Sequence, residues 1–275
     1  ITLPAAPAHA ADPITAADQS YFTYYQLDQA RAKGYTGKGV TIALIDGEVD
    51  TAAPELAGAT IIDKSPCTVH SSVYSKSHGT AIASLLVSKT YGVAPDATLL
   101  TYRTRFEDEG EDAAAGCPVH NGNGIEENNS LINRAISDGA QIISISSSDE
   151  DFDEATKWAI AHANARGVIV VTAMGNTASN ETDTGFAKWS GVVGVGAIDT
   201  TGKVASYSSW GQGTTTAAVG GPIIVRNYET GNKASTDGTS YSTPLIAGFL
   251  ALAKQKWPNA TGNQLLQLLT KTALN

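Results

Sequence analysis

The sequence predicts an α/β fold of three layers, in which a mostly parallel central sheet is flanked by helices. Three observations support this prediction. Segments with helical periodicity alternate with strand-like segments along the chain. The strand-like segments are apolar throughout rather than at every second position, which is typical of strands buried on both faces. Residues 237–255 form a helix-like segment that is apolar on nearly every side and therefore belongs inside a large domain.

The expected elements follow one another in a regular order. Residues 14–34 have the pattern of an amphipathic helix, with an apolar side made of Tyr21, Tyr24, Tyr25 and Leu27. The apolar runs predict strands at 40–46, 97–103, 141–146, 168–176 and 189–198. Helical patterns lie between them, at 78–88, 131–139 and 155–167, the last two closed by glycine. A hairpin-rich region of Gly, Thr and Ser then leads to the long buried helix and to a final helix at 264–272.

Composition limits the classes of function. The chain has 275 residues, and 42% are hydrophobic, which suffices for a sizeable core. The formal net charge of −9 argues against nucleic acid as a partner. No run is long and apolar enough to be an integral membrane segment. We expect a monomer with an N-terminal extension, residues 1–35, and one main domain, residues 36–275.

The N-terminus and the cysteines suggest export. Ala8-His9-Ala10 has the small-x-small form of a signal cleavage site, although an Ala/Pro-rich disordered tail is the alternative. Cys67 and Cys117 both lie in polar, loop-like stretches, where an exported protein is expected to form one disulfide. No metal site is predicted, because the chain contains neither a CxxC nor an HExxH spacing.

Chemically useful side chains are predicted at strand ends and helix starts. Asp46 closes the first long strand, and Asn176 follows the strand that begins at 168. His78 and Ser240 each begin a predicted helix. Each residue alone has a structural interpretation: a turn acid, a turn former or a helix cap. Together they match acyl transfer, which needs a nucleophile, a base, an acid that orients the base, and donors for the oxyanion.

The order of these residues and their local motifs give a resemblance to a known family. Aspartate, then histidine, then serine is the order found in subtilisin. ALIDGEVD, SHGTAIASLL, VVTAMGN and GTSYSTPLIAG resemble the aspartate, histidine, oxyanion and serine motifs of the subtilases, the subtilisin-like serine proteases. The likeness extends over residues 37–273 and implies a subtilisin-like fold, secretion and a bacterial source. The short N-terminal extension and the cysteine-bearing loops also resemble the mycosins, a membrane-tethered branch of the family.

The resemblance implies a role for each matched residue. Ser240 attacks the scissile carbonyl, His78 acts as general base and then as general acid, and Asp46 orients His78. The side-chain amide of Asn176 and the backbone N–H of Ser240 hold the oxyanion. The substrate binds as an extended strand between two segments, Ser146-Ser147-Ser148 and Ala173-Met174-Gly175. The implied function is a secreted serine endopeptidase.

Three departures from the family pattern have consequences. Ser148 replaces the usual glycine, which predicts a narrow S1 pocket and small P1 residues. Asp46-Gly47-Glu48 replaces the usual DTG or DSG and adds a charge near the triad. Tyr241 stands where methionine is common, which predicts low sensitivity to peroxide.

Other interpretations stay open at this stage. The acidic clusters at 107–112 and 149–154 are either solvated loops or a surface that attracts basic peptide substrates. The chemistry needs no cofactor, and the resemblance also allows a structural calcium ion, although no family calcium site matches these residues. A transpeptidase or macrocyclase would use the same acyl-enzyme. An inactive binding module is a further alternative, against which the presence of all four catalytic groups argues.

Overall fold

The computed structural model describes residues 12–65, 71–104, 128–146, 154–182 and 185–273. Its centre is a seven-stranded sheet in the order β2-β3-β1-β4-β5-β6-β7, in which every neighbouring pair is parallel. The strands are β1 (Thr41–Asp46), β2 (Thr60–Asp63), β3 (Thr98–Arg103), β4 (Ile142–Ile145), β5 (Ile169–Ala173), β6 (Val192–Ile198) and β7 (Thr214–Val219). The predicted three-layer α/β fold is therefore confirmed.

Each strand of the sheet centre contributes to two hydrophobic cores, because successive side chains point to opposite faces. In β1, Ile42 and Leu44 belong to one core, whereas Ala43 and Ile45 belong to the other. All four side chains are at most 1% exposed. This double burial explains why the strand is apolar at every position instead of alternating.

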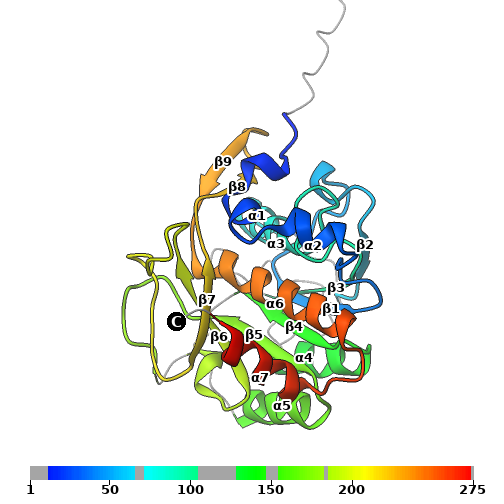
Figure 1. The fold of residues 1–275 in the computed structure, drawn as a ribbon, viewed down its shortest axis with the longest axis vertical. Helices are drawn as coiled ribbons and strands as arrows, with labels where there is room; N and C mark the ends of the chain where they lie inside the picture. Colours follow the sequence, from blue (N-terminus) through cyan, green and yellow to red (C-terminus); the bar gives the residue numbers. More distant parts are fainter. Residues whose placement is uncertain (1–11, 66–70, 105–127, 147–153, 183–184, 274–275) are drawn as a thin grey trace, which may run out of the picture.

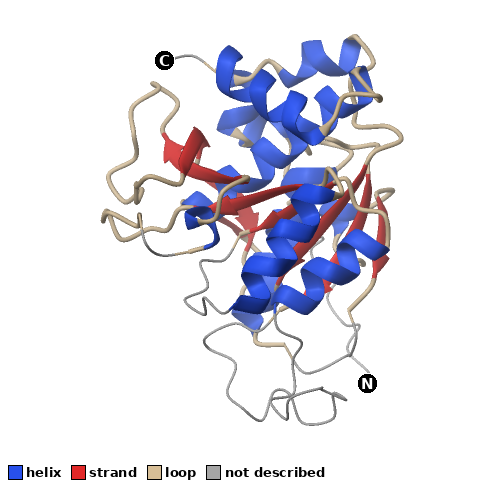
Figure 2. Ribbon diagram, turned by 90° about the horizontal axis from the view of Figure 1, so that it is seen from below, coloured by secondary structure: helices blue, strands red, loops and turns tan. Residues whose placement is uncertain are grey.

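Helices cover both faces of the sheet (Figure 2). On one face α3 (Val73–Val87) packs against α6 (Thr239–Lys256), which lies across β4 to β7. On the other face α4 (Asn128–Ser137) packs against α5 (Glu154–Ala165). The last helix, α7 (Gly262–Thr272), contacts α6 and begins with a capping box made by Thr261 and Gln264. Among the described helices, none is long and apolar enough to cross a lipid bilayer.

A hairpin at one end of the molecule leads directly to the start of α6. It consists of β8 (Ile223–Arg226) and β9 (Lys233–Thr236), which pair antiparallel. The N-terminal helix α1 (Ser20–Tyr24) lies beside it (Figure 1). Gln19 bonds both the N–H and the carbonyl oxygen of Ile224, and Lys233 pairs with Asp18 at 3.0 Å. The N-terminal segment therefore holds the hairpin in place.

The structure differs from the sequence prediction in the helix at 14–34. It contains a 3-10 turn, η1 (Ala16–Asp18), then α1 and a separate helix, α2 (Leu27–Ala32). The break falls at Gln26, whose φ of 51° is left-handed. Tyr21 and Leu27 are buried as predicted, but Tyr24 is 38% exposed.

Two further differences concern elements that carry or flank the site. Helix α3 begins at Val73, capped by the side chain of Ser72, so His78 lies in its second turn instead of opening it. Pro244 is the sixth residue of α6, beyond the first turn in which proline costs no hydrogen bond. Its missing N–H leaves the carbonyl of Ser240 without its usual helical partner.

Candidate active site

The last residue of β1 and the second turn of α3 form the first half of the site. The Nδ1 atom of His78 lies 2.7 Å from the Oδ1 atom of Asp46. Asp46 is fully buried and His78 is 7% exposed. Because a carboxylate can only accept, Nδ1 is the donor in this contact, and in the neutral imidazole Nε2 is then the basic nitrogen. The backbone N–H of Gly47 also donates to Oδ1, at 2.7 Å, and fixes the carboxylate.

This half of the site depends on a close approach between α3 and the turn after β1. A Cβ atom on Gly79 would lie 2.5 Å from the carbonyl oxygen of Gly47 and 2.6 Å from that of Glu48. A Cβ atom on Gly47 would collide with the carbonyl oxygen of Ser75. The packing of α3 on this turn therefore leaves no room for a side chain at the position directly after Asp46.

The additional charge of Glu48 is balanced at the edge of the site. Lys76 lies one turn before Thr80 in α3, and its Nζ atom is 3.5 Å from Glu48 and 3.7 Å from Asp50. About a third of each of the Lys76 and Glu48 side chains is exposed, so water screens these pairs. The backbone N–H of Asp50 donates to the hydroxyl of Thr80 at 2.9 Å, which ties the loop to the helix.

The predicted nucleophile lies at the N-terminus of α6. Ser240 is the second residue of this helix and is 8% exposed. Its backbone N–H has no partner within the helix, as for every first-turn N–H, and is oriented toward the helix start. Gly238, at the N-cap, has a φ of 153°, which a residue with a side chain rarely adopts.

Asn176 and Ser240 converge on the same space beside Gly238. A Cβ atom on Gly238 would lie 3.1 Å from Oγ of Ser240 and 3.3 Å from Nδ2 of Asn176. The amide oxygen of Asn176 accepts from the backbone N–H of Thr239 at 2.8 Å and from its hydroxyl at 3.0 Å. These two bonds identify which side of the amide is the oxygen, so the NH₂ group is the side that lies near Ser240. The hydroxyl of Thr239 also accepts from the N–H of Gly175 at 3.1 Å.

The two halves of the site meet through the residue after the nucleophile. The ring of Tyr241 lies 5.7 Å from that of His78, centroid to centroid. Burial raises the pKa of Tyr241 to about 12. Asp46 ends β1, Asn176 follows β5 and Ser240 lies in the first turn of α6. These places are at the carboxyl ends of strands, where ligands bind in open α/β sheets, and the contact with Tyr241 brings His78 beside the start of α6.

The predicted substrate-binding segments are described in part. Ser146 directly follows β4, is 4% exposed, and its hydroxyl has no hydrogen-bond partner in the described structure. Ala173 ends β5. Met174 is 3% exposed, and its sulfur packs where a Cβ of Gly194 would be, so its side chain points into the core. Ser147 and Ser148 lie outside the described residues. The preference for small P1 residues, which was inferred from Ser148, therefore stays a prediction.

Several other predictions also fall outside the described residues. These are the Cys67–Cys117 disulfide, the acidic cluster at 107–112 and most of the cluster at 149–154. In the part of the chain that the structure describes, no three His, Cys, Asp or Glu side chains come together as metal ligands would. The expectation of a structural calcium ion stays a prediction.

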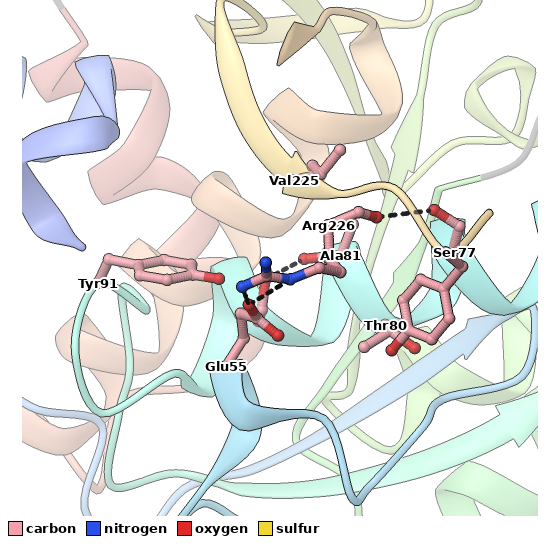
Figure 3. A pocket seen from close by; sticks show the side chains of 9 residues that line it. Glu55, Ser77, Thr80, Ala81, Tyr91, Val225 and Arg226 are labelled. Carbon is pink, nitrogen blue, oxygen red and sulfur yellow. Dashed lines mark hydrogen bonds and ion pairs between the residues drawn. The ribbon is translucent and has the colours of Figure 1, made fainter. Parts of the chain in front are cut away.

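A small polar cavity lies behind the helix that carries His78 (Figure 3). Ser77 lines it and donates to the carbonyl oxygen of Arg226 at 3.2 Å. The guanidinium of Arg226 pairs with Glu55, whose side chain is 5% exposed, and its Nε donates at 3.0 Å. These contacts connect β8 to α3 through Ser77 and to the 3-10 turn η2 (Pro54–Leu56) through Glu55.

Sequence reasoning missed the residues that hold the catalytic groups. Thr239 was seen only as part of the serine motif, and Gly79 only as part of the histidine motif. The sequence points to Thr239 only through its position directly before the nucleophile. It does not reveal the hydrogen bond from the Thr239 hydroxyl to Asn176, because the two residues are 63 positions apart in the chain. Tyr74, whose ring lies 6.1 Å from that of His78, could not be found, because the predicted helix begins only at His78, after Tyr74.

The fold, the order of the groups and the Asp46–His78 contact define a serine-peptidase-like α/β protein. The model of the subtilase family matches residues 37–275, and the chain belongs to that family. This confirms the subtilase resemblance, and the likeness to mycosins stays a prediction.

Two bacterial relatives show the extent of the similarity. The chain is 31% identical over 260 residues to a thermostable alkaline protease of Halalkalibacterium halodurans, covering 91% of this chain and 66% of that protein. It is 28% identical over 261 residues to subtilisin DY of Bacillus licheniformis, covering 91% of this chain and 89% of that protein. The chain thus spans slightly less than two thirds of the first relative.

Solved structures share the fold. A mutant of the protease domain of PatA is 25% identical, with a TM-score of 0.71, over 86% of this chain and 88% of that one. The PatG macrocyclase in complex with peptide has a TM-score of 0.73 over 90% of this chain and 87% of that one. It is 19% identical, so this second likeness concerns the fold alone.

Proposed function

We propose that the protein is a serine endopeptidase that cleaves peptide bonds through Asp46, His78 and Ser240. The observation that carries the proposal is the 2.7 Å contact between the buried carboxylate of Asp46 and Nδ1 of His78. This contact leaves Nε2 as the base that takes the proton of the Ser240 hydroxyl. The Ser240 oxygen then attacks the scissile carbonyl carbon and forms a tetrahedral intermediate. Its C–N bond breaks as His78 gives the proton to the leaving amine, and water, deprotonated by His78, hydrolyses the acyl-enzyme and restores the Ser240 hydroxyl.

The oxyanion is held by the side-chain amide of Asn176 and the backbone N–H of Ser240. Support comes from the two hydrogen bonds that fix the amide oxygen of Asn176 on Thr239 and leave its NH₂ group near Ser240. Because these donors are fixed before the reaction, they stabilise the developing charge without reorganising.

The substrate in this proposal is a peptide or protein bound as an extended strand along Ser146 and the segment from Ala173 to Gly175. The negative net charge of −9 favours basic substrates, and their kcat/KM is expected to fall as salt rises. We place the enzyme outside the cell or in the cell envelope. The bacterial alkaline protease and subtilisin relatives, together with the signal-like N-terminus, support this location.

A fluorophosphonate probe tests the proposal directly. The wild-type protein is expected to be labelled on Ser240, as mapped by peptide mass spectrometry, and the His78→Ala variant is expected to react far more slowly. A folded wild-type protein that takes up no label would contradict the proposal. Adding an amine nucleophile to the peptide assay measures how the acyl-enzyme divides between hydrolysis and transpeptidation.

A further inference from the structure

Two tyrosine rings lie next to the imidazole of His78. Tyr241 directly follows Ser240 in α6, and its ring plane is tilted by 50° to that of His78 at a centroid distance of 5.7 Å. Tyr74 lies one helical turn before His78 in α3, at 6.1 Å and 42°. The two rings differ in burial, because Tyr241 is 8% exposed and Tyr74 is 61% exposed. The subtilase motif commonly has methionine at the first of these positions.

We propose that the two tyrosines have separate roles at the active site. Tyr241 is a positioning residue that sets the tilt of the His78 imidazole. Tyr74 is a specificity residue that binds an apolar side chain of the substrate next to the scissile bond. This inference rests on the proposed peptidase function.

The role of Tyr241 follows from how both rings are held. The hydrogen bond to Asp46 fixes Nδ1 of His78, but the tilt of the imidazole about that bond depends on what packs against it. Tyr241 is fixed in the first turn of α6, and its hydroxyl lies 3.4 Å from that of Thr236 in β9. With its pKa raised to about 12 by burial, the phenol stays neutral while the enzyme works. Its ring can also attract the imidazolium that forms during the reaction.

The role of Tyr74 follows from its exposure and its place on α3. Residues four apart share one face of a helix, so Tyr74 and His78 lie on the same side. Val73, next in the chain, is also exposed, at 51%. Because His78 must reach both Ser240 and the leaving amine, the substrate passes beside the imidazole. An apolar side chain flanking the scissile bond therefore covers Tyr74 and removes the apolar surface of its ring from water.

The role of Tyr241 is tested by comparing the effects of its substitution on kcat and on KM. Active enzyme is counted with the fluorophosphonate probe, and folding is checked by thermal melting. Tyr241→Leu removes the ring and should lower kcat about tenfold, with KM changed less than about twofold. Tyr241→Phe keeps the ring and should restore most of kcat. If Tyr241→Leu does not fold, Tyr241→Met provides the same comparison, because methionine adapts to irregular gaps.

Tyr74 is tested with peptides that differ only at the residues flanking the scissile bond. Tyr74→Ala should raise KM about fivefold for peptides with Leu or Phe there and leave glycine peptides unchanged. Tyr74→Phe should behave as the wild type. Trp257→Ala is the matched control, since Trp257 is 42% exposed at the far end of α6 and should change neither constant.

Two results would overturn the inference while leaving the proposed function intact. One is a labelled, active Tyr241→Leu enzyme with unchanged kcat, or an equal loss in Tyr241→Phe. The other is a KM increase in Tyr74→Ala that is the same for glycine and apolar peptides. Absence of labelling in the wild type would instead refute the peptidase function itself.

Discussion

The two halves of the active site are held by different kinds of contact. Asp46 and His78 are brought together by a close approach of backbones, in which Gly79 lets α3 pack on the turn after β1. Asn176 and Ser240 are brought together by hydrogen bonds, in which Thr239 connects the end of β5 to the start of α6. The first half should therefore be most sensitive to added volume, and the second half most sensitive to the loss of polar groups.

The largest effect is expected at the close approach. Gly79→Ala would place a methyl group 2.5 Å and 2.6 Å from two backbone carbonyl oxygens, which cannot move aside as a flexible side chain would. We expect a loss of about 3 kcal/mol of stability and of nearly all activity. Urea unfolding and peptide hydrolysis measure both. Gly139→Ala is the control for backbone strain. No atom lies within 4 Å of its Cβ position, so this variant carries the strain of a positive φ but no steric clash.

The next largest effect is expected for the oxyanion donor. Asn176→Ala should lower kcat about 10²–10³-fold, the magnitude known for the corresponding amide of subtilisin. KM should change little, since the NH₂ group serves the transition state, whereas the unfolding midpoint should fall modestly, because Thr239 loses both of its hydrogen bonds to the amide oxygen. If the free energy of unfolding falls by as much as the activation free energy rises, Asn176 is mainly structural. The two halves of the site would then not differ in how they are held.

A smaller effect is expected at the residue that holds the donor. Thr239→Val keeps the shape but removes the hydroxyl that bonds Asn176 and Gly175, leaving the N–H bond to Asn176 in place. We expect kcat to fall about tenfold, because only one of the two lost hydrogen bonds, the one to Asn176, positions the oxyanion donor. In the Asn176→Ala background, the same substitution should have almost no further effect.

Peroxide probes the point where the two halves meet. The chain has a single methionine, Met174, which is 3% exposed, so the wild type should keep its activity in peroxide. Tyr241→Met places a thioether beside Ser240 and His78, and its remaining activity should fall severalfold on oxidation. Equal loss in the wild type would place the sensitive group elsewhere.

The smallest effect is expected at Lys76, at the edge of the half of the site that contains Asp46 and His78. Lys76→Met removes the ion pairs with Glu48 and Asp50, which are partly exposed. We expect a stability change below about 1 kcal/mol and kcat within about twofold of the wild type. A large loss of activity would mean that charge balance, and not backbone packing, maintains the Asp46–His78 contact.

The sequence predicted those features that depend on patterns along the chain. The strands buried on both faces, the core helix from Thr239 and the places of Asp46 and Ser240 follow from local apolar runs and motifs. The strand β2 was not predicted, because three of its four residues are exposed and the fourth is half-buried, which leaves no apolar run. The strand β7 was read as part of a hairpin region, because its first four residues are threonine and alanine with partial exposure.

The sequence predicted the catalytic side chains but not the residues that hold them in place. The sequence shows Gly47 only as a departure from the family motif, whereas the position of Ser75 shows that packing requires a glycine there. The contacts of Thr239 and Tyr241 join residues that are distant in the chain, so no local pattern could reveal them.

The most direct test of the whole account is whether His78 and Ser240 act as one unit. Peptide hydrolysis is measured for His78→Ala, for Ser240→Ala and for the double variant, with folding confirmed for each. We predict that each single variant loses several orders of magnitude in kcat and that the double variant loses no more than either one. Losses that multiply in the double variant would show that the two residues act independently, and would contradict the proposed mechanism.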